Sequence, residues 1–585
     1  MLFEHSVKWS SPTVCLEALQ ALRAISHNYP NIVIVCWEHI SASVYGILGI
    51  VFPEAPSRNS SELGSYPSAF IGEKVLTAAI KVLDECLRAV SGFQGTEDLS
   101  DDKLVDIPFA SDCIRIKKVS SAPSYEPDTK DHDIVNSQAC ESGTKQWCEA
   151  IEKHMPLILW HSSAMVRAAS FTCFAGMTSA VFISFTKDKQ DFVMSSLTRA
   201  ALHDDAPSVR SAACRAIGII SCFPQVSQSA EILDKFIHAV ETNTHDPLVS
   251  VRITASWALA NICDAIRHCV SYLPSGCTGS NSQLIISLSE CALRLTKDGD
   301  KVKSNAVRAL GYISRVFKCT PLSRPQDTSV DYMNHGTESF SSSGDPKGFH
   351  SCQLYSPEDS HRMEKMVQAF ISCVTTGNVK VQWNACHALG NLFLNETLRL
   401  QDMDWAPFVF GTLLQLLRDS SNFKIRIQAA AALAVPVTVH DYGLSFSDIV
   451  QGVEHVTENL SVDSNSAPSS FKYRVALQKQ LTLTMLHVLS LTSSADHDPL
   501  KAFLVKEWKN YFFLDFFFFT DSILKNSLSA FEETCQLDDQ NKSIEDRKTV
   551  MISRAIQSLV EVYKEKEQHA SAQKFEELKN KLWGV

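Results

Sequence analysis

Six segments of the sequence share one pattern of apolar and polar positions and align with one another without gaps. Each segment starts at an aliphatic anchor residue, and apolar or small residues follow four and eight positions later. Positions 0, +4 and +8 lie on one face of an α-helix, so each segment predicts a helix with one buried face. The anchors are Val166, Val209, Val251, Val302, Val381 and Ile425.

The anchors recur at intervals of 43, 42, 51, 79 and 44 residues. Three of these five intervals fall in the range of about 40–47 residues that is typical of HEAT and armadillo repeats. Turn and cap residues precede several anchors, for example at 204–207 and 245–247, and another helical segment precedes each turn. The sequence therefore predicts an all-α protein, an α-α superhelix of the HEAT/ARM-like solenoid type.

Two polar segments interrupt the period and are predicted to be disordered insertions. Residues 92–143 include the acidic stretch 96–102, and residues 320–360 are rich in Ser, Pro, Asp and Gly and fall within the longest interval. The rest of the chain divides into degenerate N-terminal repeats, two blocks of regular repeats and a C-terminal helical segment, at 1–91, 144–319, 361–500 and 501–585.

The run Tyr511–Asp521, YFFLDFFFFTD, fits none of these elements. Two interpretations stay open. The run is either a buried helical or strand-like segment, or the translation of a pyrimidine-rich intron end, because Phe codons are rich in pyrimidines.

The residues between the anchors also resemble those of a known protein family. HSSAMVRAASFTCFAGM, DDAPSVRSAACRAIGIISCFPQVSQSAEILDKFIHAVE and DPLVSVRITASWALANICDAIR resemble the HEAT-repeat-containing proteins of animals and plants, closely from His161 to Arg267 and more loosely to Val435. The resemblance implies an α-solenoid without an established enzymatic activity. It also implies a longer parent protein with further repeats upstream, of which this chain is a C-terminal or truncated form.

Composition narrows the functional class. The net charge of −11 and the pI of about 6.0 argue against the basic footprint of a nucleic-acid-binding protein. The 18 cysteines stand singly in apolar helical contexts, without any Cys-x-x-Cys pair, as expected of reduced thiols in a cytoplasmic or nuclear protein.

The N-terminus, MLFEHSVKW, lacks the basic start and apolar run of a secretory signal. The longest apolar stretch extends from Ile32 to Phe52 and is interrupted by Glu38 and His39. A charge at bilayer depth is costly, so we expect a buried repeat helix here and no membrane partner.

No common phosphate-binding, zinc-binding or nucleophile motif is found in the sequence. We therefore expect no enzymatic activity and no cofactor. His440 and Asp441 could be taken for an acid–base pair, but they follow Pro436 and are better explained as a turn cap.

A basic residue follows most of the anchors. Because this charge recurs in nearly every unit, we interpret it as structural and expect it to pair with the turn aspartates of an adjacent repeat. These residues are Arg167, Arg210, Arg252, Lys303 and Arg426.

Positions +6 and +10 differ in chemistry from repeat to repeat and share one helix face, so they are the candidate protein-binding groove. Trp257 and Asn261 are similar to the Trp-x-x-x-Asn of importin-α armadillo repeats, which lines a groove for basic peptides. Arg215 and Arg308 flank this pair and would favour an acidic or phosphorylated segment. Trp257 could also fill the core between repeats. The groove candidates are Arg215, Trp257, Asn261, Arg308, His387 and Asn391.

The sequence thus predicts a noncatalytic protein-binding scaffold or adaptor, with a protein partner and no nucleic acid. A karyopherin-like nuclear transport receptor is the alternative.

Overall fold

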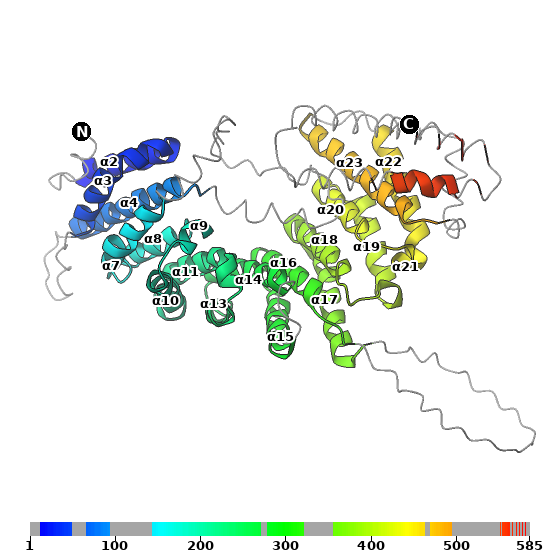
Figure 1. The fold of residues 1–585 in the computed structure, drawn as a ribbon, viewed down its shortest axis with the longest axis horizontal. Helices are drawn as coiled ribbons and strands as arrows, with labels where there is room; N and C mark the ends of the chain where they lie inside the picture. Colours follow the sequence, from blue (N-terminus) through cyan, green and yellow to red (C-terminus); the bar gives the residue numbers. More distant parts are fainter. Residues whose placement is uncertain are drawn as a thin grey trace, which may run out of the picture.

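The computed structural model describes residues 12–49, 66–93, 143–270, 278–320, 355–462 and 468–493, together with short helical pieces between 550 and 580. Within these ranges the chain is helical and contains no strand. The helices form two rows that follow one arc, and the first and last of them lie at opposite ends of it (Figure 1). The predicted all-α superhelix is confirmed.

The inner row lies on the concave side of the arc (Figure 1). Each of its helices packs on the next one in the row, so that the row is continuous from one end to the other. Its members are α2 (Pro12–Asn28), α4 (Tyr66–Val90), α8 (Ala164–Phe174), α11 (Pro207–Ile220), α14 (Val249–Val270), α16 (Asp300–Val316), α18 (Val379–Phe393), α20 (Phe423–Leu433) and α23 (Pro468–Ser490).

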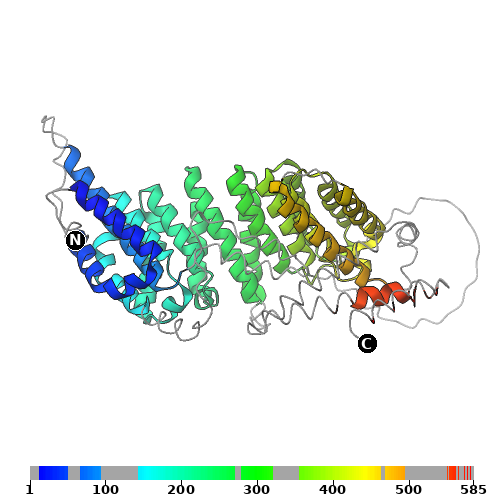
Figure 2. The same ribbon diagram turned by 90° about the horizontal axis from the view of Figure 1, so that it is seen from above.

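The outer row covers the convex side, and successive units stack along the long axis of the molecule (Figure 2). Its helices are α3 (Pro30–Leu48), α7 (Met155–Ile158), α10 (Lys187–His203), α13 (Ala230–Asn243), α15 (Thr278–Leu295), α17 (Pro357–Thr376), α19 (Ala406–Asp419) and α22 (Phe446–Val462). Short helical turns join the rows: η3 (Ala150–His154), α9 (Ser179–Ile183), α12 (Pro224–Ser227), η4 (Leu400–Asp402), α21 (Val439–Tyr442) and η5 (Gly443–Ser445).

The anchors explain why the inner row holds together. All six are buried, each on the face that meets a neighbouring helix: Val166, Val209, Val251, Val302, Val381 and Ile425. Two glycines nine positions after their anchors allow the closest approaches. A Cβ atom on Gly218 would lie 2.8 Å from the Cα of Ala258, and one on Gly311 would lie 2.7 Å from the Cα of Ala388. Small residues therefore set the spacing of α11, α14, α16 and α18.

Gly311→Ala is expected to lower the free energy of unfolding by about 1–2 kcal/mol, because the new methyl group meets backbone that cannot rotate away. Gly390 is the matched control, since it occupies the same position in α18 and a Cβ there would have 3.8 Å to its nearest neighbour. Urea unfolding followed by circular dichroism would compare the two variants. Equal midpoints for both would show that the α16–α18 contact yields easily.

One predicted boundary is wrong. Residues 357–360 were assigned to the second insertion, but α17 begins at Pro357. The Oγ of Ser356 accepts a hydrogen bond from the backbone N–H of Asp359, and acidic residues occupy the first turn. A capping serine, a proline at the first helical position and acidic residues after it form a helix start, which the polar composition concealed.

Other predicted segments lie outside the described residues. These are 94–142 and 321–354 of the two insertions, and the run Tyr511–Asp521. In the C-terminal segment, residues 553–561 form a helix in which Ala555 and Leu559 are buried. The other domain boundaries stay predictions.

Helix α3 is long and apolar enough to cross a membrane by length and composition. It is also a repeat helix, since it packs on α4 and buries residues such as Trp37 and Val44. The predicted burial holds for one face only, and Val35 is 84% exposed on the other.

Candidate functional site

A ladder of arginine–aspartate pairs fixes the register of the inner helices. Arg167 donates from Nε and Nη2 to the two carboxylate oxygens of Asp204, at 2.8 Å each. Arg210 donates from Nε and Nη2 to the one oxygen Oδ2 of Asp246, at 2.9 and 2.5 Å, and Arg252 bonds Asp298 with Nε 2.7 Å from Oδ2. The predicted pairing with the turn aspartate of the next repeat is confirmed for these three arginines.

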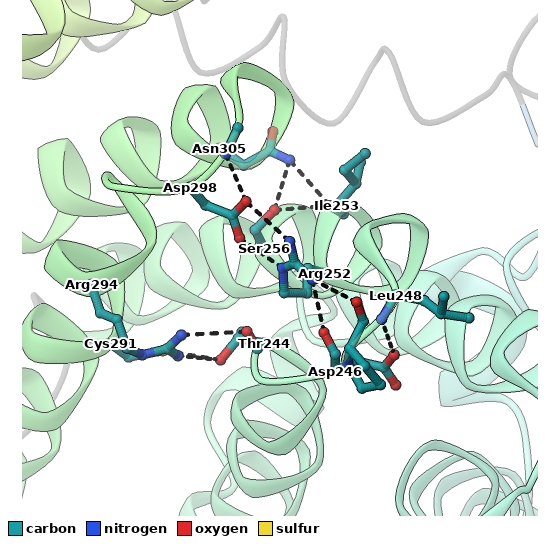
Figure 3. Close-up of polar contacts among 12 residues, drawn as sticks. Thr244, Asp246, Leu248, Arg252, Ile253, Ser256, Cys291, Arg294, Asp298 and Asn305 are labelled. Carbon is teal, nitrogen blue, oxygen red and sulfur yellow. Dashed lines mark hydrogen bonds and ion pairs between the residues drawn. The ribbon is translucent and has the colours of Figure 1, made fainter.

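Each arginine also binds the turn that precedes its own helix. Arg252 Nη1 donates to the carbonyl oxygens of Asp246 and Pro247 at 3.0 Å each, and Asp246 Oδ1 accepts from the backbone N–H of Leu248 (Figure 3). The hydrogen bond from Arg252 is the main cause that lowers the pKa of Asp298 below its ordinary value. The ladder therefore ties four successive turns together through charged hydrogen bonds, which are the stronger kind.

The prediction is wrong for the other two basic residues. Arg426 donates from Nε to the carbonyl oxygen of Leu417 at 2.8 Å, in the outer helix of its own unit, and its guanidinium lies over the ring of Phe423. Lys303 makes no ion pair with any described residue. Between α16 and α18, Asn378 Nδ2 donates to Asp300 Oδ2 at 2.9 Å. An amide thus replaces the guanidinium as the link between these units.

The groove candidates lie on four successive inner helices. Arg215 belongs to α11, Trp257 and Asn261 to α14, Arg308 to α16, and His387 and Asn391 to α18. The four helices pack on one another in succession on the concave side, so the fold brings together segments that are far apart in sequence.

The central members of this row touch one another. The guanidinium carbon of Arg215 lies 5.2 Å from the ring centre of Trp257. Arg308 Nη2 donates to Asn261 Oδ1 at 2.5 Å and to the carbonyl oxygen of Trp257 at 3.4 Å. Asn261 Nδ2 donates to the carbonyl oxygen of Gly218 at 3.1 Å. The indole of Trp257 thus makes a cation–π contact with Arg215, while Arg308 binds the backbone carbonyl of Trp257 and the side chain of Asn261.

Trp257 fits both interpretations in part. It is partly buried and packs against the core, close enough that a Cβ on Gly218 would lie 2.9 Å from its Cζ3. Arg215 is exposed, and Arg308 is partly buried with an Nε that meets no hydrogen-bond acceptor among the described residues. Donor groups and an aromatic face are therefore present together on this part of the concave surface.

His387 and Asn391 are more enclosed than a groove position requires, with exposed fractions of 9% and 2%. Trp383, one turn earlier, stacks on the His387 ring at 6.2 Å, and Tyr312 meets it edge-on at 6.1 Å. Asn391 Nδ2 lies 3.1 Å from His387 Nδ1. Burial lowers the pKa of His387 to about 4, so the ring is neutral near pH 7. These two residues are therefore buried beside the candidate groove, and Trp383 covers the His387 ring.

The sequence interpretation missed Trp383, Asp264 and Arg267. Arg267 donates from Nη2 to Asp264 Oδ1 at 3.0 Å, both side chains are 5% exposed, and the guanidinium carbon lies 5.5 Å from the ring centre of Tyr312. Trp383 stands at +2, on the same face as +6, and could have been found from that spacing. Asp264 and Arg267 lie beyond the aligned window, in the longer end of α14.

Three arginines, Arg267, Arg308 and Arg315, act on His387 and lower its pKa by their charge, whereas Asp264 raises it. Asp264 pairs with Arg267, so part of this positive charge is neutralised within the cluster.

Other chemistry is not supported within the described ranges. No group of three or more His, Cys, Asp or Glu side chains there could hold a metal ion. Asp441 forms a capping box with Thr438, accepting from its backbone N–H at 2.9 Å, as the turn-cap interpretation predicted.

Comparisons with known proteins give one relative of low identity and several solved structures of low similarity. No family model matches the chain. A putative uncharacterized protein of Dictyostelium discoideum is 26% identical over 423 residues, a match that covers 60% of this chain. The chain spans 27% of the length of that relative.

Solved structures similar to the chain include engineered and designed proteins. An engineered protein covers 83% of this chain with 15% identity and a TM-score of 0.36, and 98% of that protein is matched. A designed armadillo repeat protein covers 48% with 16% identity and a TM-score of 0.31, again with 98% of its own chain matched. Another, solved in complex with the peptide (KR)4, covers 45% with 17% identity and a TM-score of 0.26, and 95% of it is matched.

Proposed function

We propose that this chain is a noncatalytic protein-binding scaffold whose inner helix row holds an extended segment of a partner protein. The observation that carries the proposal is the contact chain of Arg215, Trp257, Asn261 and Arg308 across three successive inner helices. Stacked helical repeats build extended concave binding surfaces, and arginine and tryptophan are common energetic anchors of interfaces.

The partner segment is acidic or phosphorylated under this proposal. Arg215 and Arg308 present guanidinium groups on the concave side, and guanidinium pairs with carboxylate and phosphate in a bidentate geometry. A basic peptide would be repelled. The karyopherin-like alternative is not favoured for this reason, and neither nucleic acid nor a membrane is proposed as a partner.

A cytoplasmic or nuclear location is also part of the proposal. The cysteines whose side chains the structure describes are free thiols, and burial raises the pKa of several, among them Cys214 and Cys386 to about 12. Such thiols are inert and suit a reducing compartment. Membership of the HEAT-repeat-containing family, within a longer parent, is proposed on the phrases between His161 and Arg267.

The double variant Arg215→Glu/Arg308→Glu tests the proposal. It is expected to weaken binding of an acidic or phosphorylated peptide at least tenfold, because each change replaces attraction by repulsion at a partly desolvated site. An array of acidic, phosphorylated and basic peptides, followed by fluorescence polarisation on the hits, would measure this.

Arg199→Glu is the matched control, since Arg199 also lies over a partly exposed tryptophan, Trp160, but on an outer helix. Circular dichroism would verify that all variants stay helical. Unchanged affinity in the double variant would exclude this row as the binding surface.

A further inference from the structure

A second binding feature lies near the N-terminal end of the inner row. A pocket of about 280 Å³ opens between α2 and α4, beside the first residues of α8. Each of the two helices contributes residues at i, i+3, i+4 and i+7, from Leu16 to Arg23 and from Lys74 to Lys81. That spacing is one face of each helix, so the pocket is a groove between two parallel stripes. Its volume is below the roughly 300–1,000 Å³ of small-molecule sites and suits a single side chain of a larger ligand.

The pocket belongs to the same surface as the central arginine row. Val75, Ala79 and Leu83 are buried and repeat the 0, +4 and +8 anchor pattern in α4. Thr77 and Lys81 then occupy positions +2 and +6, which correspond to the positions of Ser211 and Arg215 in α11. A ligand that lies along the concave face therefore meets both places.

The floor of the pocket is apolar, and its rim is basic. Leu16, Leu19 and Ala78 are wholly or partly buried and form its floor, which Met165 extends. Arg23, Lys74 and Lys81 are exposed at its edge. Glu85 is an acidic neighbour, with Oε2 3.6 Å from Arg23 Nε and Oε1 2.7 Å from His27 Nδ1. Lys81 makes no ion pair with any described residue, so the rim keeps a positive charge.

We infer that this pocket binds an aliphatic side chain flanked by acidic residues, in the same partner segment that the central row holds. The inference rests on the proposed function for the identity of the segment. Burial of the aliphatic group on the floor supplies affinity, and the basic rim selects its acidic neighbours.

The distance between the pocket and the central arginine row sets the length of the partner segment. The path from α4 to α14 crosses α8 and α11, three steps of about 8–10 Å each between packed helices. An extended chain advances about 3.3 Å per residue, so roughly eight or nine residues separate the two contacts. The partner motif is an aliphatic residue among acidic ones, followed or preceded at that distance by a second acidic or phosphorylated residue.

The probe is a synthetic fluorescein-labelled peptide that carries Asp-Glu-Leu-Asp-Glu, a Gly-Ser spacer and a second acidic block eight residues away. Its affinity for the full chain is measured by fluorescence polarisation. Lys74→Glu/Lys81→Glu is expected to lower the affinity about tenfold. Ala78→Phe, which fills the pocket without changing charge, is expected to remove the preference for the probe over the same peptide with Ser in place of Leu.

Lys187→Glu, an exposed change on the outer helix α10, is the matched control and should bind like the unchanged chain. Circular dichroism confirms that each variant is folded. Full affinity and an intact leucine preference in both pocket variants would overturn the inference.

Two further outcomes separate the inference from the proposed function. A loss of affinity in Arg215→Glu/Arg308→Glu but not in the pocket variants overturns the pocket and leaves the proposed function standing. The reverse pattern supports the pocket and overturns the central row.

The acidic stretch 96–102 of this chain has similar chemistry and is tested as a rival occupant. Its acidic residues are changed to amides. Tenfold tighter binding of the probe after that change would assign the pocket to an intramolecular contact and overturn its assignment to a partner.

Discussion

Asp246→Ala is expected to lower the free energy of unfolding by about 3 kcal/mol, the lower end of the cost of removing one partner from a buried ion pair. Asp246 accepts from Nε and Nη2 of Arg210 and from the backbone N–H of Leu248, and its side chain is 5% exposed. The lower end applies because Arg210 is 18% exposed and keeps some contact with water. Urea unfolding of the full chain, followed by circular dichroism, measures the loss.

Glu231→Ala is the control, because Glu231 pairs with Lys235 on the exposed face of an outer helix. That variant should unfold at the same urea concentration as the unchanged chain. Asp246→Leu/Arg210→Met removes both charges and should recover part of the loss, since no charge is then left unpaired. Equal midpoints for Asp246→Ala and Glu231→Ala would show that the ladder follows from helix stacking and does not stabilise it.

The ladder was predictable from sequence because its chemistry is repeated. An arginine after the anchor and an aspartate in the turn recur with the period of the repeat, so neighbouring units bring them together once the helices stack. Arg167, Arg210 and Arg252 follow this rule. Arg426 does not, because the identity of its partner depends on the fold of its own unit, where the carbonyl oxygen of Leu417 is nearer.

The candidate groove was predictable in position but not in exposure. Helical spacing was sufficient to place Arg215, Trp257 and Arg308 on one face of successive helices. Helical spacing could not predict that His387 is buried, because its burial depends on Trp383 and on Tyr312 from the neighbouring helix. Equivalent positions in a repeat share a direction, while the size of the adjacent side chains decides how much water reaches them.

The start of α17 shows a different limit. Ser, Pro and Asp make a segment polar, and the same residues begin a helix when they stand in the order of Ser356, Pro357 and Asp359. The amino-acid composition of a segment does not contain the order of its residues, so it cannot reveal this helix start. Position-specific cap chemistry would have placed the end of the insertion correctly.

Two polar residues at equivalent positions of α18 and α20 are expected to respond to substitution in opposite directions. Both stand three residues after an anchor and are buried. Asn384 Nδ2 donates to the carbonyl oxygen and the Oγ of Ser304, at 2.9 and 2.7 Å. Gln428 is 0% exposed, and neither its Nε2 nor its Oε1 meets a hydrogen-bond partner among the described residues.

Asn384→Leu should destabilise the chain by about 1–3 kcal/mol, because the buried groups of Ser304 lose their partner. Gln428→Met keeps the length of the side chain and removes a buried amide that has nothing to bind, so it should stabilise the chain by about 1–3 kcal/mol. The two variants would then differ by about 2–6 kcal/mol in urea unfolding.

Gln428→Glu is the third variant of the series. It should destabilise the chain more than either neutral change, because it buries a charge without a partner. Asn384→Asp is the corresponding change at the position where the amide has hydrogen-bond partners in Ser304. If Gln428→Met lowers the unfolding midpoint as Asn384→Leu does, the amide of Gln428 has a partner that binds it in solution. The inner row would then be joined by side-chain amides from α16 through α20, and the polar links at this position would form a second ladder beside that of the arginines.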